Sequence, residues 1–242
     1  MKHLTFFLFG LLCLASCGSE EEEAPYVPQK PVNDGSVAVF QCPDEHHPHA
    51  IDLGLPSGTK WSCCNVDAAT PEAFGNYFAW GETTPHKDLT FTWGTYTHYS
   101  YDERGHVTFN HLGADIAGTD YDVAHANWGG RWKMPTKAQV EELMKHGIRF
   151  ATTHTDASGK EVKGIEIEGP KKSKIFIPCA GFYSDKGLNP VGGQFSIWTS
   201  TLNTDGDSSL KDRAIRFNGS AQKYEVGDYY RFYGLTVRPV AN

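Results

Sequence analysis

The chain is predicted to fold as an α+β domain with mostly antiparallel strands. Two observations predict this class: short strand-like runs separated by Gly, Pro, Asn and Asp dominate the sequence, and runs with helical periodicity are scarce. The two kinds of run alternate in a mixed order, which favours α+β over a regular βαβ arrangement. The content of 25 glycines and 13% aromatic residues suits short strands joined by long loops.

Strands are expected in seven runs: residues 58–66, 77–82, 164–169, 174–183, 195–201, 212–218 and 235–240. Helices are expected in only two: "DYDVAHAN", residues 120–127, and "TKAQVEELMKHG", residues 136–147. The second helix has the clearer pattern. Thr136 and Gln139 are spaced as a capping box, and Gly147 is placed to end the helix in the left-handed conformation. One helical face is apolar and consists of Val140, Leu143 and Met144.

The segment "NWGGRWKMPTKAQVEELMKHG", residues 127–147, is therefore interpreted as a structural corner: strand, turn, helix and stop. A functional interpretation would make Arg131, Lys133 or Glu141 reactive. None of them has a partner that the sequence identifies, and each is explained as a solvated or snorkelling side chain.

The first residues indicate export. Lys2 precedes the apolar run "LTFFLFGLLCLA", which is much shorter than the ~20 residues of a membrane-spanning helix and so predicts a signal peptide. The run ends in the "LASC" motif, residues 14–17, which resembles the lipobox of bacterial lipoproteins. In that family the cysteine is lipidated on its sulfur and becomes the new N-terminus. Residues 1–16 are thus expected to be a signal peptide, and Cys17 the lipid attachment site. The alternative is an ordinary secretory signal that contains a cysteine.

Residues 17–35 are predicted to be a solvated tether, because they hold four consecutive glutamates and three prolines without apolar periodicity. An acidic run behind a lipidated cysteine resembles the surface-export signal of Bacteroidota lipoproteins. The protein is therefore expected at the outer membrane, held only by its lipid and facing outward. Residues 36–242 suit a single domain. Without the glutamate run the net charge of −7 shrinks, and no basic excess exists to bind nucleic acid.

Four cysteines lie beyond the signal and the lipid site: Cys42, Cys63, Cys64 and Cys179. They allow three full pairings in an exported chain. Cys63 and Cys64 are adjacent in an expected strand, where side chains point to opposite faces, so they are poor partners for each other. None of the spacings matches a zinc site of the paired-cysteine type.

Several blocks resemble a known family in their order along the chain: "IDLGLPSGTKWSCCNVDAATPEAFGNYFAWGE", "YDVAHANWGGRWKMPTKAQVEEL", "KIFIPCAGFY", "IWTST" and "VRPV". Together, over residues 51–240, they are similar to the Fibrobacter succinogenes major paralogous domain, which is common in surface lipoproteins of Bacteroidota. The block "RWKMPTKAQVEEL" also resembles the "RLPTEAEWE" corner of formylglycine-generating-type domains. The resemblance implies a C-type-lectin-like fold: a mixed, mainly antiparallel sheet, two short helices, long loops and neighbouring termini. The strand at 235–240 would then pair near the domain start.

The resemblance also bears on the cysteines. Cys64 matches a family cysteine, whereas Cys63 and Cys179 stand where the family has small residues other than cysteine. These two departures imply a Cys63–Cys179 disulfide, with Cys42 as a competitor for either partner. The sulfatase-modifying enzymes of the related fold depend on cysteines late in the chain. None follows Cys179, so that activity is not transferred to this protein.

Two polar clusters invite a metal interpretation. The first is a histidine-rich loop with neighbouring carboxylates: Asp44, Glu45, His46, His47 and His49. The second holds Asp205 and Asp207 but lacks the glycine and glutamate of a calcium-binding EF-hand. Polar loops explain both better, and no cofactor is expected. Calcium stays open, because many C-type-lectin-like domains bind it in long loops.

The run "FTWGTYTHYSYDERGHVTFNH", residues 91–111, is the strongest functional candidate. Aromatic faces stack on sugars or anchor protein partners, and the candidate ligand-binding residues are Trp93, Tyr96, Tyr99, Tyr101 and, elsewhere, Trp198. The alternative is a hairpin whose rings close a satellite core. No G-x-S-x-G elbow, phosphate-binding glycine loop or nucleophile–base pair is evident, so no enzyme is predicted.

The leading functional hypothesis is a surface-anchored module that binds a glycan or a surface protein. The second is a structural or accessory subunit of a surface assembly, such as a fimbria or nutrient-uptake complex, which would leave an apolar patch or a strand edge open for a partner. The third, a hydrolase, would need a deep pocket with two carboxylates or a metal.

Overall fold

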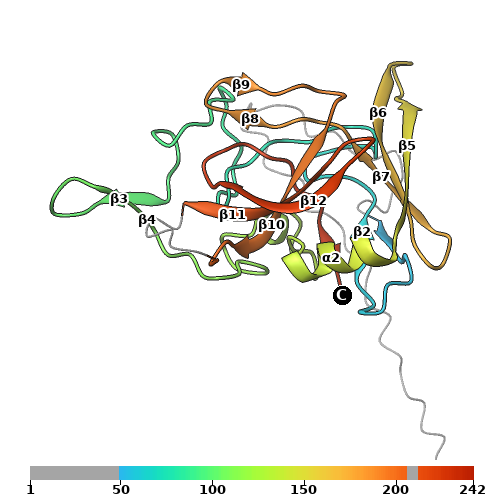
Figure 1. Ribbon diagram of the computed structural model, residues 1–242, viewed down its shortest axis with the longest axis horizontal. Coiled ribbons are helices and arrows are strands. Elements are labelled where there is room, and N and C mark those ends of the chain that lie inside the picture. Colours follow the sequence, from blue (N-terminus) through green and yellow to red (C-terminus); the bar gives the residue numbers. More distant parts are fainter. Residues whose placement is uncertain (1–48, 206–211) are drawn as a thin grey trace, which may run out of the picture.

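A computed structural model describes residues 49–205 and 212–242 of the chain. Within these residues the secondary structure consists of several small antiparallel sheets and two helices (Figure 1). This is an α+β composition, as the sequence predicts. The predicted signal peptide, the lipid site Cys17 and the tether lie outside the described residues, as do Cys42, His46, His47 and Asp207.

The helices are α1 (Val123–Trp128) and α2 (Lys137–His146). The strands of the first half are β1 (Ala50–Ile51), β2 (Lys60–Ser62), β3 (Tyr99–Tyr101) and β4 (Val107–Phe109). Those of the second half are β5 (Ile148–Thr155), β6 (Glu161–Glu168), β7 (Lys174–Pro178), β8 (Tyr183–Ser184), β9 (Gly187–Leu188), β10 (Phe195–Leu202), β11 (Arg213–Gly219), β12 (Tyr224–Tyr230) and β13 (Val240–Ala241).

The sheets have the strand orders β1-β2-β13, β10-β11-β12, β5-β6-β7, β3-β4 and β8-β9. Every pair of these strands is antiparallel, while the isolated bridges Gly181–Phe195 and Ile197–Thr236 are parallel. The last strand, β13, pairs with β2, so that Val240 lies opposite Trp61. Only Val240 of the strand expected at 235–240 lies in β13, and through this short strand the C-terminal segment pairs near the domain start.

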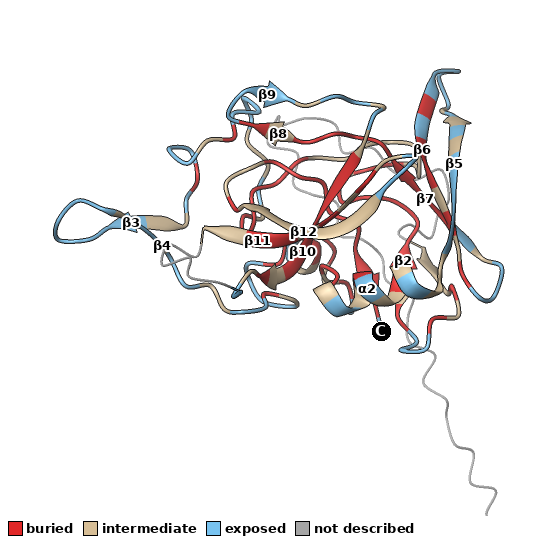
Figure 2. Cartoon of the chain, in the orientation of Figure 1, coloured by how far each residue is buried: buried red, intermediate tan, exposed pale blue. Residues whose placement is uncertain are grey.

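Helix α2 covers one face of the β10-β11-β12 sheet and closes the main core (Figures 1 and 2). Val140 and Leu143 are fully buried there, and Met144 packs against the cluster, which confirms the predicted apolar face. The predicted capping box is present as well. The Thr136 hydroxyl accepts from the Gln139 N–H at 3.2 Å, and the Gln139 carboxamide oxygen accepts from the Thr136 N–H at 2.9 Å.

Replacing Thr136 with alanine should lower the free energy of unfolding by about 1 kcal/mol, because an N–H in the first turn of α2 loses its acceptor. Chemical denaturation measures the change, and Thr136→Ser, which keeps the oxygen, should lose less. Ligand binding should be unchanged, since the cap is structural. A large loss of binding at normal stability would contradict the structural interpretation of this corner.

The predicted left-handed stop at Gly147 is wrong. Gly147 has φ −86° and ψ 138°, an extended conformation that leads directly into β5. The glycine is needed for space instead, because a Cβ there would lie 2.5 Å from Ile167 Cγ2 and 2.7 Å from the Leu143 carbonyl oxygen. The residue therefore allows the helix end to approach β6 closely.

The predicted strands at 164–169, 195–201 and 212–218 are largely confirmed as parts of β6, β10 and β11. Residues 77–82 do not form a strand and make only the bridge between Phe78 and Leu235. Strands β5 and β12 were not predicted from the sequence. Nearly all residues of β5 are exposed, and all residues of β12 are of intermediate burial. Neither strand therefore has one buried and one exposed face, which is the arrangement that produces alternating apolar and polar residues in a sequence.

Candidate functional site

The hairpin of β3 and β4 projects from one end of the molecule (Figure 1). Its turn is built around Asp102, whose Oδ1 accepts from the N–H groups of Arg104 at 2.9 Å and His106 at 2.8 Å. Gly105 has φ +78°, a left-handed conformation that favours glycine at this position. Within β3, Tyr99 and Tyr101 lie two residues apart and so point to the same face. The local sequence thus places two tyrosines side by side on a protruding element.

Three rings form a continuous row on this hairpin and the loop before it. The Trp93 and Tyr99 ring centroids are 5.7 Å apart at an interplanar angle of 67°, and those of Tyr99 and Tyr101 are 5.7 Å apart at 82°. Trp93 is 46% exposed and Tyr101 is 57% exposed, while Tyr99 is half-buried between them. We call these three residues the aromatic ladder. Edge-to-face contacts hold the rings in place while leaving apolar surface in solvent.

Tyr96 and Trp198, the other two predicted ligand-binding residues, are core residues, and this corrects the prediction for them. Tyr96 is 2% exposed, and its hydroxyl donates to the Trp80 carbonyl oxygen at 2.7 Å and accepts from Arg231 Nε at 2.9 Å. Trp198 is fully buried and donates from Nε1 to the Phe78 carbonyl oxygen at 2.8 Å. Neither ring can stack on a ligand at the surface.

The satellite core predicted as the alternative for this segment is present. Tyr96 and Phe91 belong to a buried cluster, and Tyr99 and Phe109 of the hairpin pack against it. The segment therefore has both roles. Its inward rings close a core, and this core supports the outward rings of the ladder.

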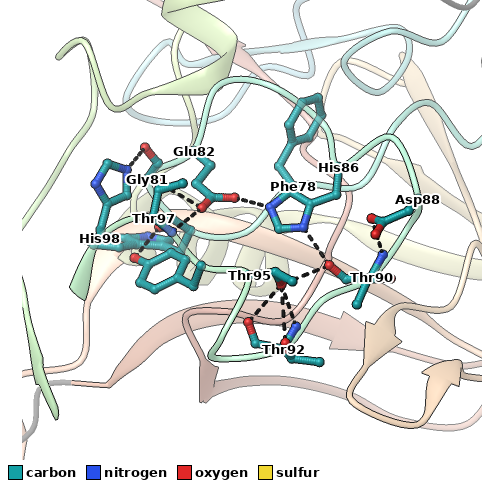
Figure 3. Close-up of polar contacts among 12 residues, drawn as sticks. Phe78, Gly81, Glu82, His86, Asp88, Thr90, Thr92, Thr95, Thr97 and His98 are labelled. Carbon is teal, nitrogen blue, oxygen red and sulfur yellow. Dashed lines mark hydrogen bonds and ion pairs between the residues drawn. The ribbon is translucent and has the colours of Figure 1, made fainter. Parts of the chain in front are cut away.

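A carboxylate–imidazole pair, Glu82 and His86, stabilises the loop that contains Trp93 of the ladder (Figure 3). Glu82 Oε2 lies 2.6 Å from His86 Nε2, and Glu82 Oε1 accepts from the N–H of Thr97 at 2.7 Å and from its hydroxyl at 2.8 Å. His86 Nδ1 lies 2.6 Å from the Thr90 carbonyl oxygen. The imidazole also stacks on Phe91 at 4.6 Å and 4°. Glu82 and His86 thus connect the two ends of residues 82–97, the segment that contains Trp93.

The contacts of His86 define its protonation. Both ring nitrogens face oxygen acceptors, and an imidazolium, which donates from both, satisfies them together with an ionised Glu82. The hydrogen bond to Glu82 is the main cause that raises the pKa of His86. Burial acts to raise the pKa of Glu82, but hydrogen bonds from His86 and Thr97 outweigh it and the pKa is lowered. Neither ring nitrogen is left to act as a general base, so the pair is structural.

Residues 82–97, which include Trp93, should therefore be most stable at pH values between the pKa of Glu82 and the pKa of His86. Stability from His86 is fully present below its unfolded pKa, about 6.5, and is lost as the pH rises through the raised folded pKa. Stability from Glu82 is lost as the pH falls through its lowered pKa. The chemical shift of the Thr97 amide, measured by NMR over pH, reports this contact. His86→Gln should abolish the change in the Thr97 amide shift at high pH. A His86 imidazole that titrates at or below pH 6.5 would contradict the assignment.

A second aromatic cluster was missed from the sequence. The run "YYRFY", residues 229–233, contributes four half-buried rings: Tyr229, Tyr230, Phe232 and Tyr233. Tyr230 and Phe232 are stacked at 5.2 Å, and Phe232 packs against the same buried cluster as Tyr99 of the ladder. Four aromatics in five positions are a signal that could have identified this cluster. It extends the aromatic surroundings of the ladder.

The other candidate residues do not assemble a chemical site. Residues 49–205 and 212–242 contain no group of three or more His, Cys, Asp or Glu side chains arranged to bind a metal ion. Arg131 is exposed near the Trp132 ring, Lys133 bridges to Val240 through its backbone, and Glu141 lies 3.9 Å from Lys137 at the surface. These contacts are structural.

The predicted Cys63–Cys179 disulfide is not formed in the structure. Cys179 is a buried free thiol, and burial raises its pKa. The Cys63 sulfur accepts from the backbone N–H of His49 at 3.3 Å. Two departures from a family pattern suggested this pairing, but such departures carry no information on the distance between the two sulfur atoms.

Comparisons of the chain with known protein families, with curated proteins and with solved structures give no match. No helix among the described residues combines the length and apolar character needed to cross a membrane.

Proposed function

We propose that the protein is a lipid-anchored surface module with a C-type-lectin-like fold that binds glycans through the aromatic ladder. The observation that carries the proposal is the exposure of Trp93 and Tyr101 on a projecting hairpin, with Tyr99 between them. Pyranose rings present apolar faces that stack on such side chains. The pairing of β13 with β2 and the mainly antiparallel sheets support the fold assignment. The lipobox-like motif and acidic tether support attachment at Cys17 and outward display.

The first test is a polysaccharide and mucin-glycan array probed with the unlipidated chain, residues 18–242, with calcium and with a chelator. Trp93→Ala and Tyr101→Ala should each weaken binding about tenfold, which corresponds to roughly 1.4 kcal/mol for a lost ring contact. Leu188→Ala is the matched control, because Leu188 is 45% exposed on a different hairpin. Its binding should be unchanged. No glycan binding in either condition would contradict the proposal.

The anchor has its own test. Cys17→Ser should release the protein from the membrane fraction, and continued attachment would contradict the lipid assignment.

One observation favours the second candidate function, a subunit of a surface assembly. Among residues 49–205 and 212–242, strand β5 leaves a long sheet edge open, which is the feature expected of a protein that receives a partner strand.

A further inference from the structure

Within the part of the chain that the structure describes, strand β5 is the uncovered edge of the β5-β6-β7 sheet. It is eight residues long, and no other strand of the described residues pairs with its outer side. Most of the strand has the colour of exposed residues in Figure 2. Six of its residues are exposed, and Thr152 and His154 are half-buried. The far edge of the same sheet is contacted instead, because Arg238 Nη2 donates to the Phe176 carbonyl oxygen of β7 at 2.7 Å.

The register of the sheet determines which backbone groups of β5 are free. Asp156, just after β5, donates its N–H to the Lys160 carbonyl oxygen at 2.9 Å, and hydrogen-bonded pairs then recur at every second residue of the antiparallel ladder. Lys163 of β6 accepts from the Cys179 N–H at 2.9 Å, so its backbone faces away from β5, as this alternation requires. The N–H and C=O groups of β5 that pair with no other described strand therefore belong to Arg149, Ala151, Thr153 and Thr155.

This edge lacks most of the features that usually prevent strand addition, and Arg149 is its only Lys, Arg, Asp or Glu residue. Residues 148–155 contain no proline, lysine or carboxylate, and the register with β6 runs without a bulge. Two large apolar side chains instead lie on one face of the strand. Ile148 is 54% exposed and Phe150 is 45% exposed. A long edge with exposed apolar side chains is the type that pairs with another strand.

A second copy of β5 fits this edge in backbone register and in the placement of its side chains. Hydrogen bonds between two β5 strands can form only between residues whose backbone N–H and C=O groups point away from β6. In an antiparallel pair these residues lie opposite one another, so the side chains of the same face are aligned in both copies. With the two-fold axis at Ala151, Arg149 lies opposite the partner's Thr153. Arg149 is the only Lys or Arg in the strand and avoids its own copy in this register. On the other face Phe150 lies opposite the partner's Thr152, so the apolar side chains of both copies share one side.

We propose that two copies of the protein associate through β5, antiparallel about a two-fold axis at Ala151, to form a continuous six-stranded sheet β7-β6-β5-β5-β6-β7. An isologous contact of this kind closes on itself and gives a dimer. The β3-β4 hairpin lies at the opposite end of the molecule from β5 and β6 (Figure 1). A β5 dimer would therefore carry its two ladders at its outer ends, where both are free to engage a multivalent surface.

The mass of the unlipidated chain, residues 18–242, tests the proposal in sedimentation velocity over a range of concentrations. The wild-type chain should pass from one to two chains as the concentration rises. Ala151→Pro removes an outward N–H and leaves every hydrogen bond to β6 in place, so it should stay monomeric at the same concentrations. Ala151→Ser keeps the N–H and should dimerise like the wild type. A monomeric wild type at the highest soluble concentration, or a dimeric Ala151→Pro chain, would overturn the proposal.

Cross-linking tests the register independently of affinity. The axis brings the two Ala151 Cα atoms to about 5.5 Å, the spacing of a hydrogen-bonded antiparallel pair and within the range of a disulfide. Ala151→Cys should form a covalent dimer on oxidation, well above the level of the wild-type chain with its native cysteines. Thr155→Cys, with an outward backbone but no partner cysteine opposite, should not. The reverse pattern would disprove this register. Glycan binding by a chain that stays monomeric would leave the ladder proposal standing while this one fails.

Discussion

Replacing Arg238 with alanine should lower the free energy of unfolding by about 3–5 kcal/mol, the largest effect expected of any single change. The side chain is fully buried and donates to Asn65 Oδ1 at 2.9 Å, to the Ser62 carbonyl oxygen at 3.1 Å and to the Phe176 carbonyl oxygen at 2.7 Å. It therefore joins β2, the following loop and β7. Alanine would leave three acceptors without a donor and a cavity of side-chain size, and denaturant unfolding would measure the loss.

Two further variants separate the possible causes. Arg238→Met keeps much of the volume but has no donor. Arg238→Lys keeps the charge, but its three donors share one nitrogen and cannot reach the acceptors that Nε, Nη1 and Nη2 of arginine contact separately. Both should lose most of the stability that alanine loses. Arg213→Met is the matched control, since Arg213 is partly exposed and paired with Asp228 at 2.9 Å, and a change below about 1 kcal/mol is expected. An Arg238→Met protein as stable as the wild type would mean that packing alone matters at this position.

The second large effect is expected at Asp122, the N-cap of α1. Its buried carboxylate accepts from four backbone N–H groups: Gly118 at 2.8 Å, Ala124 at 2.9 Å, His125 at 3.1 Å and Met134 at 2.9 Å. The last of these ties α1 to the corner that precedes α2. Asp122→Ala should lower the free energy of unfolding by about 3 kcal/mol, because ordinary N-cap losses are near 1 kcal/mol and two further donors lose their acceptor.

Asp122→Asn tests whether shape is sufficient at this site. The carboxamide offers one oxygen and places an NH₂ group against N–H donors, so most of the loss should remain. Asp120→Ala, at an exposed position two residues earlier, should change stability by less than about 0.5 kcal/mol. Thermal or denaturant unfolding measures the free energy of unfolding of the three variants. An Asp122→Asn variant as stable as the wild type would show that the second carboxylate oxygen is dispensable.

Local features were predictable from the sequence because their physical causes are local. The α2 capping box joins residues three apart, and the apolar face of Val140, Leu143 and Met144 follows from helical spacing alone. Gly147 shows the limit of such reasoning. A glycine after a helix usually permits a left-handed turn, but here the close approach of Ile167, twenty residues later, is what requires it.

The candidate site was predictable only as a segment. Residues 91–101 alternate aromatic and polar side chains, and this pattern does not say which rings face solvent. Tyr96 is buried in an apolar cluster and accepts from Arg231, 135 residues later, whereas Trp93 has no comparable hydrogen bond among the described residues. The Glu82–His86 pair was also missed, since a histidine four residues from a glutamate is common and gains meaning only from its contacts.

The sequence by itself determined the α+β composition, the position and cap of α2 and the expectation of a lipidated, exported chain, because spacing and residue type carry that information directly. Only the tertiary structure decided that Trp93 and Tyr101 are exposed, that Tyr96, Trp198 and Arg238 are interior, and that β5 is an open edge among the described strands. The physical reason is the same in each case. Burial and edge position depend on segments that are distant in the chain, and no local pattern specifies which of them come together.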